Sequence, residues 1–260
     1  MIKIGLLLTV RLKSTRLPLK ALREIQGKSL IQHIIDRARN TSIFDNFVLC
    51  TSYNHQDLPL ILVAIENQLK YFAGDEDNVI ERLYKASNLF GFDYFINISG
   101  DNPLFSFKYT NKLVEYLQKD HGVDYIFTSG LPLGMNVQGI KVSTLKKVCE
   151  VNDIKDTEIW GYYLNQPDYF NVVELNVEQA DALPVDRVTI DEESDLAMFS
   201  EIISSFHPDE LITEPMLKKL FLENRSIFEI NKDVVQKYPP SSQIDRINKI
   251  ISSNFQSKSA

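Results

Sequence analysis

Short apolar runs alternate with segments of helical periodicity along most of the chain, and this alternation constrains the fold more than any other feature. Strand-like runs cover residues 4–8, 47–50, 71–72, 94–98, 125–128 and 188–190, with an extended segment at 137–141. Apolar residues at helical spacing predict helices at 28–40, 57–69, 74–90, 106–119, 143–150, 196–205 and 214–223. Strands that alternate with helices pair mostly in parallel and are covered on both faces. The sequence therefore predicts an α/β fold with a three-layer, mostly parallel sheet.

Length and composition limit the class of protein. A chain of 260 residues allows one large α/β domain or a domain with an appendage. We divide it into a domain at 1–223, which contains a small arm subdomain at about 150–187, and a C-terminal extension at 224–260. The net charge of −7 argues against a nucleic-acid binder. No apolar run approaches the roughly 18 residues of a membrane span. No signal peptide is visible. Cys50 and Cys149 alone form no disulfide framework. We therefore expect a cytoplasmic protein.

A cluster of cations follows the first predicted strand. The stretch from Thr9 to Arg23 contains no acid, although the chain as a whole has 28 Lys+Arg against 35 Asp+Glu. Open α/β folds bind ligands at the carboxyl ends of their strands, and Arg suits phosphate oxygens, to which Ser14 and Thr15 add hydroxyl donors. The loop is thus a candidate anion site, although a solvated loop of surface charges explains the spacing equally well. The cations are Arg11, Lys13, Arg16, Lys20 and Arg23.

Acids occur after two further predicted strands and at the start of one helix. Residues 99–103 follow one strand, residues 191–195 follow another, and residues 75–77 open the helix predicted at 74–90. Acids at a helix N-terminus suit the helix dipole, and for residues 75–77 we favour this explanation over metal binding. Arg82 in the same helix can be read as a surface charge. Gly27-Lys28-Ser29 is not a P-loop, because Leu22 stands where that motif requires glycine.

Four segments resemble one known family. Residues 11–22 match R-x-x-S-T-R-L-P-x-K-x-L, which is similar to the signature loop of the SpsF-like cytidylyltransferases, relatives of the Kdo and acylneuraminate cytidylyltransferases. Residues 74–82 resemble G-S-E-D-N-V-L-D-R, residues 99–104 resemble T-G-D-x-P-L, and residues 187–195 resemble R-L-T-V-D-x-x-E-D. The match covers roughly residues 1–206, and four segments in register make it specific. It implies the Rossmann-like fold of the nucleotide-diphospho-sugar transferases.

The resemblance also implies a reaction and its residues. CMP would pass from CTP to a small anionic or sugar acceptor with release of pyrophosphate, for surface polysaccharide or glycoconjugate biosynthesis. Asp101 and Asp191 would hold Mg²⁺, while Arg11, Arg16 and Lys20 neutralise phosphate charge and form the catalytic group together with Asp101. The implied nucleotide-binding residues are Leu8, Val10, Arg11, Ser14, Thr15, Arg16, Lys20, Thr51, Ser52, Asp75, Asn78, Val79, Ser99, Gly100 and Asp101.

The half of the family pattern that faces the acceptor is altered. The family's G-L-D-V-E stretch corresponds to residues 134–138, in which the amides Asn136 and Gln138 replace both acids. The family's E-H-V-T element corresponds to residues 157–160, which lack its histidine. We place the acceptor near Asn102, Asn136, Gln138 and Glu158. Neutral amides would not repel an anion, so we expect an acceptor with a carboxylate or phosphate near the reacting oxygen. The alternative is that both amides are polar loop residues that face water.

Two other functions stay open at this point. A uridylyl- or guanylyltransferase for a sugar 1-phosphate usually has a glycine-rich first loop, and residues 9–16 contain no glycine. A non-catalytic nucleotide-binding homologue would explain the altered amides, but not the retention of both aspartates together with Arg16 and Lys20. The aromatic residues of the 150–187 stretch suggest a partner surface or an ordinary core, and by analogy with the related enzymes we expect a homodimer formed there.

Overall fold

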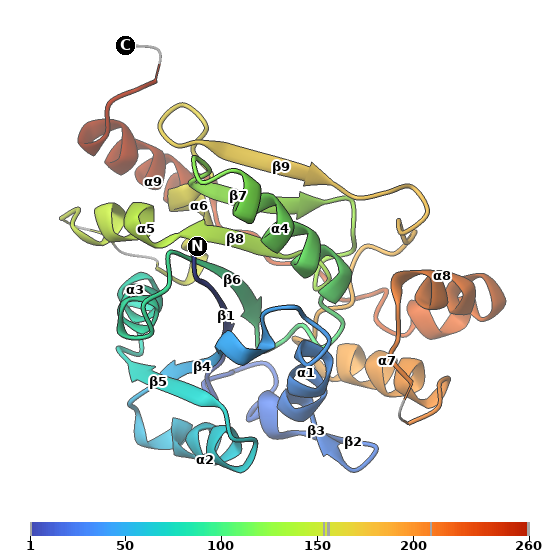
Figure 1. The fold of residues 1–260 in the computed structure, drawn as a ribbon. Helices are drawn as coiled ribbons and strands as arrows, with labels where there is room; N and C mark the ends of the chain where they lie inside the picture. Colours follow the sequence, from blue (N-terminus) through green and yellow to red (C-terminus); the bar gives the residue numbers. More distant parts are fainter. Residues whose placement is uncertain (1, 153, 155–156, 209, 259–260) are drawn as a thin grey trace.

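The computed structural model describes residues 2–152, 154, 157–208 and 210–258. Its main feature is a seven-stranded sheet in the order β5-β4-β1-β6-β8-β7-β9 (Figure 1). β8 pairs antiparallel with β6 and β7, and the other neighbours pair in parallel, so the predicted mostly parallel α/β fold is confirmed. The strands are β1 (Ile4–Thr9), β4 (Phe47–Ser52), β5 (Lys70–Gly74), β6 (Tyr94–Ser99), β7 (Tyr125–Ser129), β8 (Gln138–Lys141) and β9 (Val172–Asn176).

Helices cover both faces of the sheet and give the molecule two apolar cores. Along β1, Leu6 and Leu8 pack into one core and Leu7 into the other, as the alternating side chains of a strand buried on both faces must do. In the described ranges, no helix combines the length and the apolarity needed to cross a bilayer. The first core takes residues from α1 (Leu30–Ala38), α2 (Leu58–Glu66), α4 (Phe107–Lys119), α7 (Glu193–Ser204) and α8 (Glu214–Glu223); the second takes them from α3 (Val79–Leu89), α5 (Val142–Cys149), α6 (Gly161–Leu164) and α9 (Ser241–Asn254).

Several elements differ from the sequence prediction. Residues 188–190 do not form a strand of the sheet. The adjacent Arg187 forms an isolated β-bridge with Leu133. The last strand is instead β9, which lies at the edge of the sheet and is only partly buried, so its apolar pattern is weak. A small hairpin of β2 (Glu24–Ile25) and β3 (Lys28–Ser29) precedes α1. α3 begins at Val79, five residues later than predicted, because the side chain of Asn78 caps it.

The aromatic residues expected to form a partner surface are mostly internal. Trp160, Tyr163 and Phe170 are 6%, 0% and 4% exposed and belong to the second core. α9 packs beside α6 (Figure 1), where Ile247 and Ile251 are fully buried. The arm therefore uses its aromatic residues to hold the C-terminal helix of the same chain, which the weak pattern after residue 224 did not predict.

Candidate active site

The cationic loop after β1 is fixed by a buried carboxylate. Asp57 has no exposed surface, and its two oxygens accept hydrogen bonds from the backbone N–H of Leu12 at 2.7 Å and from the hydroxyl of Ser52 at 2.5 Å. Ser14 Oγ accepts from the backbone N–H of Leu17 at 3.2 Å. These bonds hold the loop at the carboxyl edge of the sheet, beside the end of β6. Asp57 was not singled out in the sequence, because nothing local shows that it is buried.

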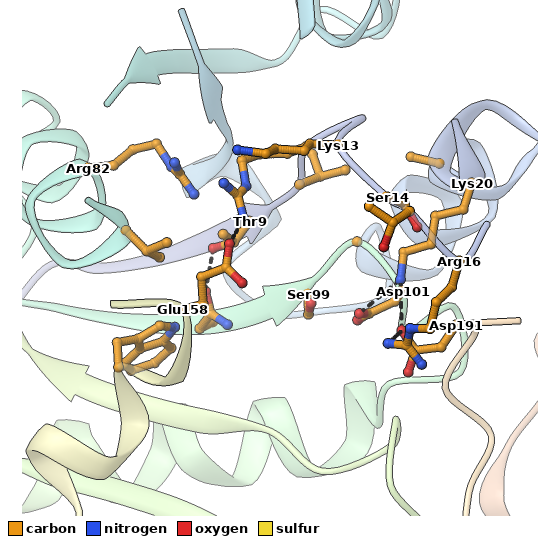
Figure 2. A pocket seen from close by; sticks show the side chains of 18 of the residues that line it. Thr9, Lys13, Ser14, Arg16, Lys20, Arg82, Ser99, Asp101, Glu158 and Asp191 are labelled. Atoms are coloured by element: carbon orange, nitrogen blue, oxygen red, sulfur yellow. Dashed lines mark hydrogen bonds and ion pairs between the residues drawn. The ribbon is translucent and has the colours of Figure 1, made fainter. Parts of the chain in front are cut away.

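Lys20 joins two aspartates that are 90 positions apart in the sequence. Its Nζ lies 3.3 Å from Asp101 Oδ2 and 3.1 Å from Asp191 Oδ1, and it also donates to the carbonyl of Ile190 at 2.9 Å. Arg16 Nη2 lies 3.1 Å from the same oxygen of Asp191. Figure 2 shows the four charged side chains gathered at one end of the cavity. The structure thus brings Lys20 and Arg16, two of the three cations predicted to neutralise phosphate charge, together with the two predicted metal-binding carboxylates, whereas Arg11 lies outside this cluster.

Opposite charges keep this cluster ionised. Burial opposes the charge on Asp191, but Lys20, Arg16 and Arg187 outweigh it and hold the pKa of its carboxyl below the ordinary value. Burial likewise opposes the charge on Lys20, but Asp101 and Asp191 prevail and raise the pKa of its ammonium group. At neutral pH one ammonium group therefore bridges two carboxylates, and phosphates or a metal ion can compete for these charges.

A second layer of bonds orients Asp191. Arg187 Nη2 donates to Asp191 Oδ2 at 3.3 Å and to Asp195 Oδ2 at 2.8 Å, and Asp195 also accepts from the backbone N–H of Asp191 at 2.9 Å. Asp195 is fully buried and is part of the capping box of α7. Of the acids at 191–195, Asp191 therefore faces the cavity, whereas Asp195 holds the backbone in place.

The segment that carries Asp191 approaches the sheet through a glycine. Gly134 has φ of +99°, and a Cβ built on it would lie 2.5 Å from the backbone nitrogen of Thr189. That distance is too short for a real side chain, and the φ value also favours glycine. Val188 donates its N–H to the carbonyl of Leu133 at 2.8 Å, and Ile190 donates to that of Asp101 at 2.9 Å. Gly134 thus lets residues 187–191 lie against the backbone at residues 133–134. This packing places Asp191 beside Asp101.

A cavity of about 510 Å³ opens between these groups and the arm. One end holds Lys20, Arg16, Asp101 and Asp191, and the other holds Arg82 and Glu158, with Ser99 between them (Figure 2). Arg11 donates to the carbonyl of Glu76 at 2.7 Å and forms an ion pair with Glu158. The cavity is lined by Thr9, Val10, Arg11, Lys13, Ser14, Thr15, Arg16, Lys20, Ala21, Val79, Arg82, Asn97, Ser99, Gly100, Asp101, Gln138, Glu158, Trp160 and Asp191.

Several predicted nucleotide-binding residues lie outside this lining. Asn78 caps α3 by accepting the N–H of Glu81 at 3.1 Å, and Asp75 accepts the N–H groups of Asp77 and Asn78, each at 2.8 Å. These bonds organise the turn before α3, so Asp75 has a structural role there, although residues 75–77 precede the helix and its first turn holds Glu81 instead. Leu8, Thr51 and Ser52 are fully buried in or beside the sheet.

The predicted acceptor residues separate into two groups. Gln138 and Glu158 line the cavity, and Gln138 Oε1 accepts from the hydroxyl of Tyr125 at 2.5 Å. Asn136 does not line it; its amide nitrogen donates to the carbonyls of Leu131 at 2.8 Å and Pro132 at 3.3 Å. Asn102 also lies outside the lining. The idea that both altered amides face the acceptor therefore does not fit this arrangement, because Asn136 is used to hold its own loop.

Arg82 was read as a surface charge, and this is wrong. Its side chain is 0% exposed, and it lines the cavity. Val79, Arg82, Leu83 and Ala86 stand at i, i+3, i+4 and i+7, so helical spacing places Arg82 on the buried face of α3. Thr9 and Asn97, which are joined by a 2.7 Å hydrogen bond, also line the cavity and were missed. Their positions in strands that end there were the available signal.

The carboxylates suit a cation that shares its ligands with phosphate. Mg²⁺ is usually held by one or two carboxylates, with phosphate oxygens and water in the remaining positions. Among the described residues, no group of three or more His, Cys, Asp or Glu could hold a metal ion. Asp101 and Asp191, which face one cavity and already share one cation, fit an ion that needs the nucleotide to complete its coordination.

Comparisons with known proteins point to one family. A family model described as cytidylyltransferase matches residues 6–234. An uncharacterised protein of Methanocaldococcus jannaschii, MJ1063, is 27% identical over 235 residues, which cover 89% of this chain and 95% of that protein. The spore coat polysaccharide biosynthesis protein SpsF of Bacillus subtilis is 26% identical over 196 residues, covering 73% and 81% of the two chains. A cytidylyltransferase structure from Leptospira borgpetersenii has a TM-score of 0.82 at 22% identity and covers 92% of this chain and 100% of its own.

Proposed function

The chain belongs to the cytidylyltransferase family, a family of nucleotidyltransferases, and on that premise we propose that it transfers CMP from CTP to a small acceptor with release of pyrophosphate. The observation that carries this proposal is the cluster of Lys20, Asp101 and Asp191 at one end of the cavity. Cations and two carboxylates meet there at the carboxyl edge of a mostly parallel sheet, where such folds bind nucleotides. The same residues argue against a non-catalytic homologue, since nucleotide binding alone would not require both carboxylates.

The reaction needs charge stabilisation more than covalent chemistry from the protein. An acceptor oxygen forms a bond to the α-phosphorus, and the bond from that phosphorus to the bridging oxygen of pyrophosphate breaks. Pyrophosphate leaves with the bonding electrons, so negative charge grows on the leaving phosphates. Lys20 and Arg16 lie where they can neutralise that charge, and the hydroxyls of Ser14 and Thr15 can donate to phosphate oxygens. A phosphate acceptor needs no general base, whereas a hydroxyl acceptor must lose a proton.

We propose that Asp101 and Asp191 hold Mg²⁺ together with the nucleotide. The ion, when bound, would neutralise phosphate charge and polarise the reacting phosphoryl group. Lys20 lies between the two carboxylates, and its ammonium group could also donate to phosphate oxygens of the nucleotide. Arg187 and Asp195 hold Asp191 in its orientation.

We place the acceptor beside Gln138, which lines the cavity together with Glu158. Gln138 uses its oxygen to accept from Tyr125, which leaves its amide N–H groups for a ligand. An acceptor with a carboxylate or phosphate near the reacting oxygen suits these donors, and surface polysaccharide or glycoconjugate synthesis consumes such activated compounds. We propose a homodimer, although burial of the arm aromatics removes the observation that favoured residues 150–187 as its interface. The proposed boundary at residue 223 separates chain segments that share both apolar cores.

Pyrophosphate release tests the proposal directly. Purified protein is given CTP, UTP, ATP or GTP with Mg²⁺ or with a chelator, and a panel of sugar acids, alditol phosphates and sugar 1-phosphates. We expect release only with CTP, Mg²⁺ and one class of acceptor, and calorimetry should show tighter binding of CTP than of a purine triphosphate.

Variants connect the activity to the proposed cluster. Asp101→Asn and Asp191→Asn should each lower kcat at least about a hundredfold, or about 3 kcal/mol, with the fold intact. Glu115→Gln, an exposed change on α4, is the matched control and should leave kcat unchanged. Near wild-type turnover by either aspartate variant at saturating Mg²⁺ would contradict the assignment, and tighter binding of a purine triphosphate would contradict the choice of CTP.

A further inference from the structure

Arg82 is a buried cation whose hydrogen-bonding capacity is only partly used. It stands first among the largest fully buried side chains. Its Nη1 donates to the backbone carbonyls of Asp75 at 2.5 Å and Glu76 at 3.1 Å, which fixes the orientation of the guanidinium group. Within the described part of the chain, the buried Nε and Nη2 have no hydrogen-bond partner. Native proteins rarely leave buried donors unpaired, so these two atoms point to a ligand.

No carboxylate of the described residues forms an ion pair with Arg82. Among the described residues, the cations that form ion pairs at the cavity are Arg11, Lys13, Arg16 and Lys20. None of these ion pairs includes Arg82. Burial and, next, the charge of Arg11 lower the pKa of Arg82, and the smaller opposing effects of Asp57 and Asp75 do not offset them. A structural salt bridge therefore does not explain why an arginine stands here.

The chain makes room for this side chain beside the cavity. A Cβ built on Gly74, the last residue of β5, would lie 2.9 Å from Arg82 Cγ, so glycine lets the stem of Arg82 pass the strand end. Figure 2 shows Arg82 at the end of the cavity away from Lys20, Asp101 and Asp191. Val10 and Val79 line the same cavity and offer apolar surface on which a flat ring can rest.

The two free donors select their partner by geometry. The Nε and Nη2 hydrogens of a guanidinium group point in parallel from one edge, so they match two adjacent acceptors. Cytosine presents two such acceptors, O2 and N3, whereas uracil carries a hydrogen on N3 and would set a donor against a donor. We propose that Arg82 binds O2 and N3 of cytosine and thereby selects CTP over UTP, an inference that rests on the proposed cytidylyltransferase function.

Binding requires one neighbour to move, because Arg82 is 0% exposed. Arg11 is the charged neighbour, and its side chain is 15% exposed and paired with Glu158, which is 66% exposed. An ion pair open to solvent is weak, so the triphosphate can draw Arg11 toward the other end of the cavity. Departure of Arg11 removes a like charge from Arg82 and gives the base access to the free edge of its guanidinium group.

Calorimetry with three nucleotides tests the inference on the full chain. The wild-type protein with Mg²⁺ is titrated with CTP, UTP and 3-deaza-CTP, in which a C–H group replaces N3. We expect CTP to bind at least about tenfold more tightly than either analogue, since each leaves one donor of Arg82 unpaired. In Arg82→Gln and in Arg82→Lys, which keeps the charge but not the parallel donors, the three affinities should become similar. Glu115→Gln should retain the wild-type ratios.

The possible results separate this inference from the function on which it rests. Equal affinity of the wild type for CTP and 3-deaza-CTP would overturn the role of Arg82 and leave the transferase proposal standing, whereas no CTP binding at all would overturn that proposal. Folded Arg82 variants that keep the CTP preference, or that lose only affinity for an anionic acceptor, would also overturn the inference. If both Arg82 variants fail to fold, Gly74→Ala provides the test, because its methyl group crowds the Arg82 stem. This variant must weaken the preference for CTP over 3-deaza-CTP. An unchanged preference would overturn the inference.

Discussion

Asn231 donates its side-chain amide to Oδ1 of Asp195 at 2.8 Å, and both residues are buried. The other oxygen of Asp195 accepts from Arg187 and from the backbone of Asp191. A residue beyond position 223, in the segment predicted as an extension, therefore holds the carboxylate that orients a proposed metal ligand. The segment after α8 thus supports the candidate active site.

Replacing Asn231 should therefore affect both stability and metal use. Asn231→Ala leaves a buried carboxylate oxygen without its donor, which should lower the free energy of unfolding by about 1–3 kcal/mol. Because Asp191 is then less well oriented, the Mg²⁺ concentration for half-maximal activity should rise. Urea denaturation and a Mg²⁺ titration measure the two effects. Asn254→Ala, an exposed change in α9, is the control, and an unaltered Mg²⁺ dependence in Asn231→Ala would show that this layer does not act on the site.

The pH dependence of stability should carry a signature of Asp191. Its folded-state pKa is held below the ordinary value of 3.8, so the unfolded chain binds a proton at a higher pH than the folded chain does. The contribution of Asp191 to stability is then complete above pH 3.8 and is lost as the pH falls through the lower folded-state pKa. Unfolding free energies of wild type and Asp191→Asn, measured by urea from about pH 6 to about pH 3, should converge toward the acid end. A constant difference over that range would count against the assigned shift.

Replacing Asn136 and Gln138 by the acids of the family pattern should have different effects at the two positions. Asn136→Asp removes a donor and sets a carboxylate against the carbonyls of Leu131 and Pro132, so it should cost about 1–3 kcal/mol of unfolding free energy without changing acceptor preference. Gln138→Glu can still accept from Tyr125 but adds negative charge to the cavity, so it should raise KM for an anionic acceptor with little loss of stability. The two variants are matched controls, and the reverse pattern in denaturation and kinetics would refute the placement.

The sequence predicts those parts of the fold whose burial shows in local pattern. β1, β4 and β6 are apolar along nearly their whole length because both faces are covered, so they were recognised. β9 is an edge strand with partly exposed side chains, so it lacks a strong pattern. α9 is mostly polar, but Ile244, Ile247 and Ile251 recur at helical spacing, and this available signal was missed. Within the candidate site, the loop from Arg11 to Lys20 was found through its charge and motif. Asp57 and Asn231 were not, because only tertiary contacts show what they bind.

α9 lies outside the family match, which ends at residue 234, and its packing can be tested by stability. Ile247 and Ile251 are fully buried, and Phe255 meets Phe170 of the arm with ring centroids 5.0 Å apart. Ile247→Ala should lower the free energy of unfolding by about 2–5 kcal/mol, as expected for truncation of a buried isoleucine. The measurement is the urea midpoint.

The comparison of two changes in α9 decides whether the helix is part of the folded unit. Lys249→Ala, on an exposed position of the same helix, should change the unfolding free energy by less than about 0.5 kcal/mol, because it removes no core contact. If Ile247→Ala has as small an effect as Lys249→Ala, α9 does not contribute to the second core in solution. If the predicted loss occurs, the arm that carries Glu158 and Trp160 is stabilised by the C-terminal helix, since α6, which follows Trp160 directly, packs against α9. Urea unfolding of the isoleucine variant should then remain a single transition, because α9 and the rest of the second core unfold together.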